Sequence, residues 1–281
     1  MQIPNKVIPM TQEELLPYEG IASPGSTNSY QRKVGTLMYA AVMTRPDIAF
    51  ASSRLARFNQ NPGPLHHKAA DRVIWYLLQT RGHSLEFGSE PGSEEDGLQV
   101  ASDASFGDNS LDRRSSQAFT MRLFGGITSW KANKQDTVTT STTEAELLAL
   151  SQAAKEALFA SRLLSAMKID LSAPTARRRT AQPSRVTIEC DNKQTIRLVK
   201  EELIKLRTKL RHVDIHNHWL RQEITQGRID VVYTSSAQLL ADGFTKALPS
   251  DKFELFMQRL RLADLSEKLG MNRRRELEEE L

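Results

Sequence analysis

Several ingredients of common functional sites are scarce in this 281-residue chain. Cys190 is the only cysteine, so an internal disulfide and a zinc site built from several thiolates are both excluded. No apolar run reaches the length of a membrane helix, and the N-terminal MQIPNKVIPM lacks the apolar stretch of a signal peptide. We therefore expect a protein of the cytoplasm or the nucleus that is neither secreted nor bound to a membrane.

The charges show only a small excess of one sign. Lys plus Arg number 38 and Asp plus Glu number 34, which gives a formal net charge of +4. This balance supports a polyanionic partner only weakly and fits an ordinary soluble protein equally well. Hydrophobic residues make up 39% and charged residues 26% of the chain, which excludes a wholly disordered protein.

The first part of the chain predicts an irregular start followed by helices. Residues 1–29 end in IASPGSTNS, whose Pro, Gly, Ser and Asn predict an irregular segment. Residues 30–88 have a helical pattern, and the first helix should end near Arg45-Pro46 because proline disfavours helix in the residue before it. GSEPGSEEDG at 88–97 predicts a linker or an exposed hairpin loop, with a domain boundary there or close to it.

Residues 97–249 change character and predict an α/β domain with a mixed five-stranded sheet flanked by helices. Three segments separated by turns predict an antiparallel meander: LQVASDAS (98–105), SQAFTMRLF (116–124) and ITSWK (127–131). Two later strands are entered through helices and should join in parallel: VTIEC (186–190) and IDVVY (229–233). The covering helices are expected at 142–164, directly after 190, at 212–227 and at 237–248.

Two charged segments are expected to bury little. SAPTARRRTAQPSR (172–185) has almost no large apolar residue and predicts a flexible insertion. Its arginines at 177–179 could touch phosphates, but a solvated loop is the better interpretation. Residues 250–281, which end in MNRRRELEEEL, predict a charged C-terminal helical tail.

Four acids fall where such a sheet could bring them together: Asp103 inside the first strand, Glu146 in the first turns of the long helix, Asp191 at the end of the fourth strand and Asp242 in the final helix. Clustered carboxylates repel one another and stay charged together only when cations bridge them. Hard oxygen ligands select Mg²⁺ or Mn²⁺, and two such ions about 4 Å apart can activate a water and stabilise the leaving oxygen of a phosphodiester. The set therefore predicts nuclease chemistry.

Each of these acids also has a purely structural explanation. The spacings from Thr143 to Glu146 and from Ser141 to Glu144 both fit a capping box. Asp191 could cap the helix that follows it, and Asp242 could be a surface residue. No single acid decides between the two interpretations, but the ordered set, each member on a suitable element, favours a site.

Several motifs closely resemble the ribonuclease H region of Ty1/copia-type retrotransposon polyproteins: SDAS followed by RRSS, ITSWKANKQ, STTEAELLALSQAAKEAL, CDNKQTIRL, HVDIHNHWLRQEI and QLLADGFTKALP. This resemblance covers about 98–249. Upstream, YQRKVGTLMYAAVMTRPDIAFASSRLARFNQNP is similar to the thumb or connection segment that follows the polymerase palm in the same polyproteins.

The resemblance implies a ribonuclease H-like fold preceded by a small helical segment. It also implies a metal set of Asp103, Glu146, Asp191 and Asp242 that holds two Mg²⁺ or Mn²⁺ ions. Glu144 competes for the helix position, and Glu146 is preferred because Glu-Leu-x-Ala is the more widespread pattern in ribonucleases H. The implied activity is endonucleolytic hydrolysis of the RNA strand of an RNA–DNA hybrid, with the polymerase portion of a reverse transcriptase as a further partner.

The chain departs from the family pattern in several respects. The loop TSSAQLLAD before the last acid has no histidine, and SDASF replaces the more usual SDADW. No Tyr-x-Asp-Asp palm motif and no integrase-like zinc motif occur, so the chain resembles the C-terminal piece of a reverse transcriptase. The alternative is a catalytically inactive remnant that acts as a nucleic-acid-binding or interaction module.

Some basic residues are candidates for contacts with the hybrid backbone, because phosphate contacts supply most non-specific affinity. They are Arg113, Arg114, Lys131, Lys209 and Arg211. A solvated surface explains them equally well. A zinc site at His212, His216 and His218 is disfavoured against surface or structural histidines, and Trp130 is better explained as a core residue than as a base-stacking one.

Overall fold

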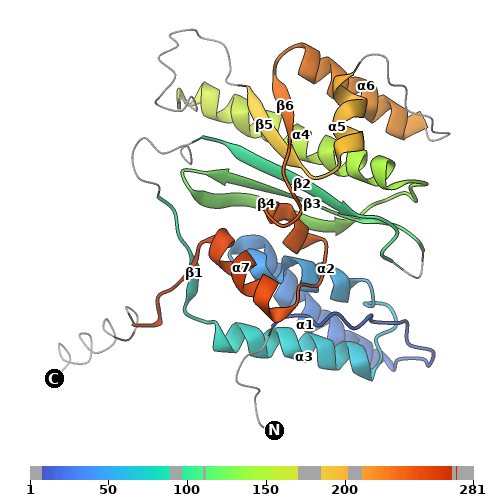
Figure 1. Ribbon diagram of the computed structural model, residues 1–281. Helices are drawn as coiled ribbons and strands as arrows, with labels where there is room; N and C mark the ends of the chain where they lie inside the picture. The colour runs from blue at the N-terminus through green and yellow to red at the C-terminus, as the bar shows by residue number, and fades with distance from the viewer. Residues whose placement is uncertain are drawn as a thin grey trace. The chain divides into compact units, whose positions relative to one another are not determined.

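The computed structural model describes residues 8–88, 97–109, 112–169, 185–201, 211–267 and 270. The chain forms two compact units (Figure 1): a helical unit, Met1–Glu86 with Ala247–Leu281, and a sheet unit, Phe87–Lys246. Most of the predicted 88–97 linker, nearly all of the 172–185 insertion and the tail from 271 lie outside the described residues. None of the helices in the described ranges combines the length and hydropathy of a membrane-spanning segment.

The helical unit begins earlier than the sequence predicted. Its first helix, α1 (Pro24–Met43), starts six residues before Tyr30, within the segment expected to be irregular. Ser23 caps it by accepting a hydrogen bond from the backbone N–H of Ser26, and Pro24 takes the first-turn position where proline is tolerated. The proline and serine that indicated irregular structure are therefore a helix-start signal. The expected end of this helix before Arg45-Pro46 is confirmed.

Three further helical elements follow in the helical unit: η1 (Pro46–Ile48), α2 (Ala49–Ala56) and α3 (Pro64–Gln79). Helix α1 packs against α2 and α3. The buried faces of α1 and α2 contribute Tyr30, Leu37 and Leu55, and the Tyr30 hydroxyl donates to the backbone oxygen of Leu55.

Residues 250–264 are part of the helical unit, which corrects the expectation of a charged tail over 250–281. Helix α7 (Ser250–Leu260) buries Phe253, Phe256 and Leu260, which recur at helical spacing. Strand β7 (Leu262–Asp264) then pairs antiparallel with β1 (His83–Leu85). The charged residues of α7 lie on its outer face. Because they make the segment polar on average, its composition did not indicate the apolar stripe.

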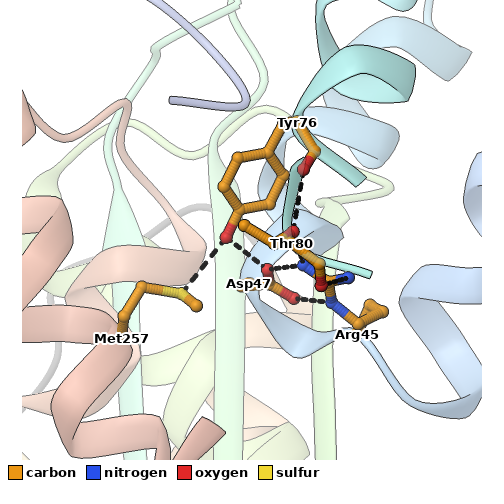
Figure 2. A network of polar contacts seen from close by, with 5 residues as sticks. All are labelled: Arg45, Asp47, Tyr76, Thr80 and Met257. Atoms are coloured by element: carbon orange, nitrogen blue, oxygen red, sulfur yellow. Dashed lines mark hydrogen bonds and ion pairs between the residues drawn. The ribbon is translucent and has the colours of Figure 1, made fainter. Parts of the chain in front are cut away.

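A buried polar network crosses the helical unit (Figure 2). The Arg45 guanidinium donates two hydrogen bonds to the Asp47 carboxylate, at 3.0 and 2.6 Å, and a third to the backbone oxygen of Thr80 at 3.0 Å. The Tyr76 hydroxyl donates to Asp47 Oδ2 at 2.6 Å and lies 3.4 Å from the sulfur of Met257. The network therefore connects the end of α1, η1, α3 and α7.

The sheet unit contains β2 (Gln99–Ser105), β3 (Ser116–Leu123), β4 (Gly126–Lys134), β5 (Val186–Cys190) and β6 (Ile229–Tyr233). The strand order is β4-β3-β2-β5-β6. Strands β2, β3 and β4 form an antiparallel meander, whereas β5 joins β2 in parallel and β6 joins β5 in parallel. The predicted ribonuclease H-like fold with a mixed five-stranded sheet is confirmed.

Helices α4 (Thr142–Ala166), α5 (Lys193–Lys200) and α6 (Arg211–Thr225) complete the sheet unit. Helix α4 packs against β2, β3 and β5, and α5 and α6 pack against α4. The core between them includes Val100, Leu147, Leu150, Ile188 and Leu220. The helix expected at 237–248 is shorter than predicted: it is one 3₁₀ turn, η3 (Leu240–Phe244).

Successive side chains of β2 point to opposite faces of the sheet, and they show that α4 and η3 cover different faces. Val100 belongs to the core beneath α4, whereas its neighbour Ala101 packs with Leu239 and Ala241 at η3. Asp103, two residues further along β2, shares the face of Ala101. The sheet unit ends at Lys246, shortly after η3 and slightly before the predicted boundary at 249.

Candidate active site

The four predicted acids come from four different elements and meet at one place. Asp103 lies within β2, and Asp191 directly follows the end of β5, the parallel neighbour of β2. Glu146 lies near the start of α4, and Asp242 lies in η3, which contacts β2 and β3. Polar residues at the carboxyl end of adjoining parallel strands are the usual position of a site in an α/β sheet.

The distances are short enough for shared ligands. One carboxylate oxygen from each of Asp103, Asp191 and Asp242 lies within 4.8 Å of the others. Oxygens of Glu146 and Asp191 and the sulfur of Cys190 form a second group within the same limit. Asp191 belongs to both groups, so the two groups are adjoining parts of one cluster.

The structure separates Glu146 from its competitor Glu144. Glu144 Oε2 accepts hydrogen bonds from the backbone N–H and the hydroxyl of Thr140, at 2.7 and 2.8 Å, and its own N–H is capped by Ser141 Oγ. Glu144 therefore belongs to the cap of α4. Glu146 turns to the cluster, where its carboxylate accepts a backbone hydrogen bond from Ala104.

One oxygen of Glu146 has no hydrogen-bond partner among the described residues. Glu146 is only 5% exposed, and its Oε2 atom is buried and unsatisfied. Leaving a buried carboxylate oxygen unpaired is costly. A bound cation would satisfy this atom.

Burial and mutual repulsion raise the pKa values of two of the carboxyls. Burial raises the pKa of Asp103 to about 6, although the Lys246 ammonium and the Thr245 hydroxyl act in the opposite direction. Burial raises the pKa of Glu146 to about 9, and the charges of Asp103 and Asp191 add to the effect. Without further positive charge, the cluster therefore resists full ionisation at neutral pH.

The donor set fits a hard divalent cation. Four carboxylates supply oxygen ligands of the kind that Mg²⁺ and Mn²⁺ prefer. The Cys190 thiol is buried, and burial raises its pKa further, which keeps it protonated and makes it a poor ligand. The residues that could hold ions are therefore Asp103, Glu146, Asp191 and Asp242.

Three polar side chains that the sequence analysis did not assign support these carboxylates. The Thr245 hydroxyl donates to Asp103 Oδ2, and the Ser236 hydroxyl donates to Asp191 Oδ2 at 2.6 Å. The Lys246 ammonium donates to Asp242 Oδ1 and lies 3.9 Å from Asp103 Oδ2. Two of the three, Thr245 and Lys246, belong to the GFTKALP segment, which is part of the motif that resembles the family.

The candidate nucleic-acid contacts lie on several elements. Arg113 and Arg114 are in the loop between β2 and β3, where Arg113 is exposed with φ 56° and Arg114 lies 3.7 Å from Asp112. Lys131 is exposed on the edge strand β4, and Arg211 is exposed at the start of α6. Lys209 lies outside the described residues.

The histidines of α6 have ordinary structural partners. His216 Nδ1 forms a 2.9 Å hydrogen bond with the Ser151 hydroxyl, and His218 lies 3.7 Å from Asp214. Within the described ranges, no group of three possible metal ligands contains a histidine. Trp130 is half-buried on β4.

No protein-family model matches the chain. It is 34% identical over 226 residues to the retrovirus-related Pol polyprotein from transposon TNT 1-94 of Nicotiana tabacum, covering 80% of this chain and 16% of that protein. It is 30% identical over 250 residues to the Pol polyprotein from transposon RE2 of Arabidopsis thaliana, covering 89% and 16%. A shorter match is 41% identical over 130 residues to the secreted RxLR effector protein 161 of Plasmopara viticola. It covers 46% of this chain and 89% of that protein.

Solved structures show similarity at low sequence identity. The ribonuclease H1 of the archaeon Halobacterium salinarum matches 50% of this chain and 86% of its own, with a TM-score of 0.32 and 12% identity. A foamy viral protease-reverse transcriptase in complex with RNA/DNA hybrid matches 83% of this chain and 27% of its own, with a TM-score of 0.43 and 14% identity. The chain spans about a sixth of the length of the Pol polyproteins that it matches. It belongs to the family of retrovirus-related Pol polyproteins from transposons.

Proposed function

We propose that the sheet unit is a divalent-metal-dependent endonuclease that hydrolyses the RNA strand of RNA–DNA hybrids. The observation that carries the proposal is the convergence of carboxylates from β2, α4 and η3 on Asp191 at the end of β5, together with the buried, unsatisfied oxygen of Glu146. Membership of the Pol family supports it, because a nuclease of this kind acts on the hybrids that reverse transcription produces.

The positions of the four acids indicate separate roles. Asp103 and Asp191 come from neighbouring strands at the centre of the sheet, so they would be the main bridges between two Mg²⁺ or Mn²⁺ ions. Glu146 would hold one ion and position the scissile region, and Asp242 would complete the ligand set of the other. Two bound divalent ions would supply the Lewis acidity that phosphodiester hydrolysis needs.

The chain's own hydrogen bonds hold this ligand set in place. Thr245 fixes the orientation of Asp103, and Ser236 fixes that of Asp191. Such supporting contacts commonly change activity or metal affinity by about 10- to 100-fold when they are removed. The side chains are therefore held near their working geometry before a substrate arrives.

Substrate recognition would depend on shape and backbone rather than on base sequence. A hybrid duplex has A-form character, and its 2′-hydroxyls distinguish the RNA strand in the wide minor groove. The exposed cations Arg113, Lys131 and Arg211 would contact phosphates. The polymerase portion of a reverse transcriptase is the protein partner that the family suggests.

Cleavage of a labelled RNA–DNA hybrid in Mg²⁺ tests the proposal. We expect the full chain to cut the RNA strand and Asp103→Asn to lose at least ~100-fold in rate, since Asp103 would be a principal metal ligand. The matched control is Asp136→Asn, an exposed aspartate in the turn before α4. Equal cleavage by the wild-type chain and Asp103→Asn would refute the proposal. A folded wild-type chain that binds hybrid without cutting it would instead establish the alternative of an inactive binding module.

A further inference from the structure

A positively charged side chain lies among the carboxylates of the candidate site. The Lys246 ammonium donates a hydrogen bond to Asp242 Oδ1, four residues earlier in the chain, and lies 3.9 Å from Asp103 Oδ2. The Lys246 side chain is 42% exposed, whereas that of Asp103 is 1% exposed. The ammonium therefore occupies the solvent side of the Asp103–Asp242 pair.

We propose that Lys246 is an internal counter-ion, which holds the Asp103–Asp242 side of the cluster until a divalent cation displaces it. The inference rests on the proposed function, because it concerns the same carboxylates. Lys246 is a positioning residue in this role: it sets how tightly one of the two ions binds and touches no reacting atom.

The ammonium and an ion would compete for the space beside these oxygens. A magnesium ion binds its ligands at about 2.0–2.1 Å, so an ion held by Asp103 and Asp242 would lie close to the ammonium that now bonds to Asp242 Oδ1. Asp103 Oδ2 already accepts a hydrogen bond from Thr245 and has little room for two further cations. Like charges at this separation also repel. Binding of an ion between Asp103 and Asp242 therefore requires the ammonium to leave.

The surrounding structure allows that movement. Phe244 and Thr245, next to Lys246, are buried and fix the backbone, so only the side chain has to turn. A lysine side chain has a flexible four-carbon stem and a strongly hydrated head group, which makes solvent an acceptable destination. Its present exposure shows that the path to solvent is short.

The other side of the cluster differs in this respect. Glu146 forms no ion pair with any described residue, and its Oε2 atom is unsatisfied. Asp191 accepts a hydrogen bond from the neutral hydroxyl of Ser236 and forms no ion pair with a described residue. We therefore expect unequal affinities: the ion near Glu146 and Asp191 binds first, and the ion between Asp103 and Asp242 binds more weakly.

Mn²⁺ binding to the full chain, measured by calorimetry and by the spin-resonance signal of free Mn²⁺, tests the inference. Lys246→Met removes the ammonium at similar side-chain length, and Lys246→Gln is a second variant that keeps polarity. Lys134→Met is the matched control, because Lys134 forms a 2.6 Å ion pair with Asp112 in the same unit. We expect the weaker Mn²⁺ dissociation constant to fall about tenfold in both Lys246 variants, a typical coupling between two sites, and to stay unchanged in Lys134→Met.

Thermal unfolding supplies a second measurement that does not depend on activity. In EDTA, Lys246→Met should have a lower Tm than the wild-type chain, because the carboxylates lose their counter-ion. Saturating Mn²⁺ should raise the Tm of Lys246→Met by more than that of the wild-type chain, as linkage requires. Dissociation constants within twofold of wild type, together with equal Mn²⁺-induced shifts, would overturn the role of Lys246 alone. Absence of Mn²⁺ binding in every variant would overturn the proposed metal site itself.

Discussion

The hydroxyl of Thr245 donates a hydrogen bond to Asp103 Oδ2 and ties the segment after η3 directly to the central strand β2. Both residues are about 1% exposed, so water does not compete for this contact. The bond fixes one oxygen of the most buried carboxylate in the cluster. The last part of the sheet unit in sequence thereby orients an acid near its start.

We expect Thr245→Val to lower the rate of hybrid cleavage by about tenfold, since it removes a hydrogen bond that orients a metal ligand. Valine has nearly the same shape, so the fold should persist. Thr245→Ser keeps the hydroxyl and should retain most of the activity. Steady-state kinetics on a labelled hybrid would measure both.

Thr139→Val serves as the control for this prediction. Thr139 is also buried, and its hydroxyl contacts that of Ser115 at 3.2 Å rather than one of the four acids. If Thr139→Val and Thr245→Val reduce cleavage equally, the loss comes from general destabilisation, and the orienting role of Thr245 is wrong.

The sequence predicted the acids but not the side chains that hold them. Asp103 stood out because a carboxylate within a strand needs a partner, and the strand and helix pattern placed the other three nearby. Thr245 and Lys246 carry no such local signal. Their contacts exist only because η3 packs on β2 and β3, which is a tertiary arrangement that periodicity does not report.

The raised pKa of Glu146 predicts that the metal-free protein loses stability as the pH rises. A carboxyl whose pKa is about 9 when folded, against an ordinary value of 4.5, binds its proton more tightly in the folded state. Its contribution to stability is therefore complete below about pH 4.5 and is lost as the pH rises towards about 9.

Glu146→Gln should remove this loss, because the amide cannot ionise. In EDTA at pH 8, the variant should exceed the wild-type chain in free energy of unfolding by at least about 1 kcal/mol, with a smaller difference at pH 5. Urea denaturation at the two pH values measures it. Saturating Mg²⁺ should favour the wild-type chain instead, and a difference that does not change with pH would contradict the prediction.

In the helical unit, the sequence predicted α1 and where it ends. It did not predict where the unit begins or that α7 belongs to it. Pro24 was assigned to an irregular segment although it lies in the first turn of α1. Phe253, Phe256 and Leu260 have helical spacing, yet the surrounding charge led to the prediction of a tail. In both places the positions of the residues indicated a helix, whereas the overall composition of the segment indicated irregular or exposed structure.

The Arg45–Asp47 pair predicts a large loss of stability for Asp47→Asn. Both side chains are buried, and the change leaves the guanidinium without its charged partner and weakens the acceptor of the Tyr76 hydroxyl. Breaking a buried pair in this way typically costs about 3–5 kcal/mol. Urea denaturation of the full chain would measure the change in free energy of unfolding.

Asp71→Asn is the matched control for Asp47→Asn. Asp71 pairs with Lys33 at 2.5 Å between side chains that are both partly exposed, so its loss should cost less than about 1 kcal/mol. Similar losses in free energy of unfolding for the two variants would show that burial does not determine how much the Arg45–Asp47 pair contributes to stability.

His66 predicts a loss of stability in acid that originates in the helical unit. Its Nδ1 accepts a hydrogen bond from the backbone N–H of Gly63, so the proton is on Nε2, which donates to the backbone oxygen of Leu16 at 2.9 Å. The ring also stacks on Phe58. Burial lowers the pKa of His66 below its ordinary value of 6.5. Protonation would place a second hydrogen on Nδ1 against the Gly63 N–H.

A lowered histidine pKa means that the contribution of His66 is complete above about pH 6.5 and is lost as the pH falls below that value. We expect the free energy of unfolding of the wild-type chain to fall between pH 7 and pH 5. In His66→Asn the fall should be smaller, since the amide can still accept from Gly63 and does not titrate in this range. Urea denaturation at several pH values tests this. Parallel pH profiles for the two proteins would assign the acid sensitivity to other groups, because the Asn variant lacks the titrating imidazole.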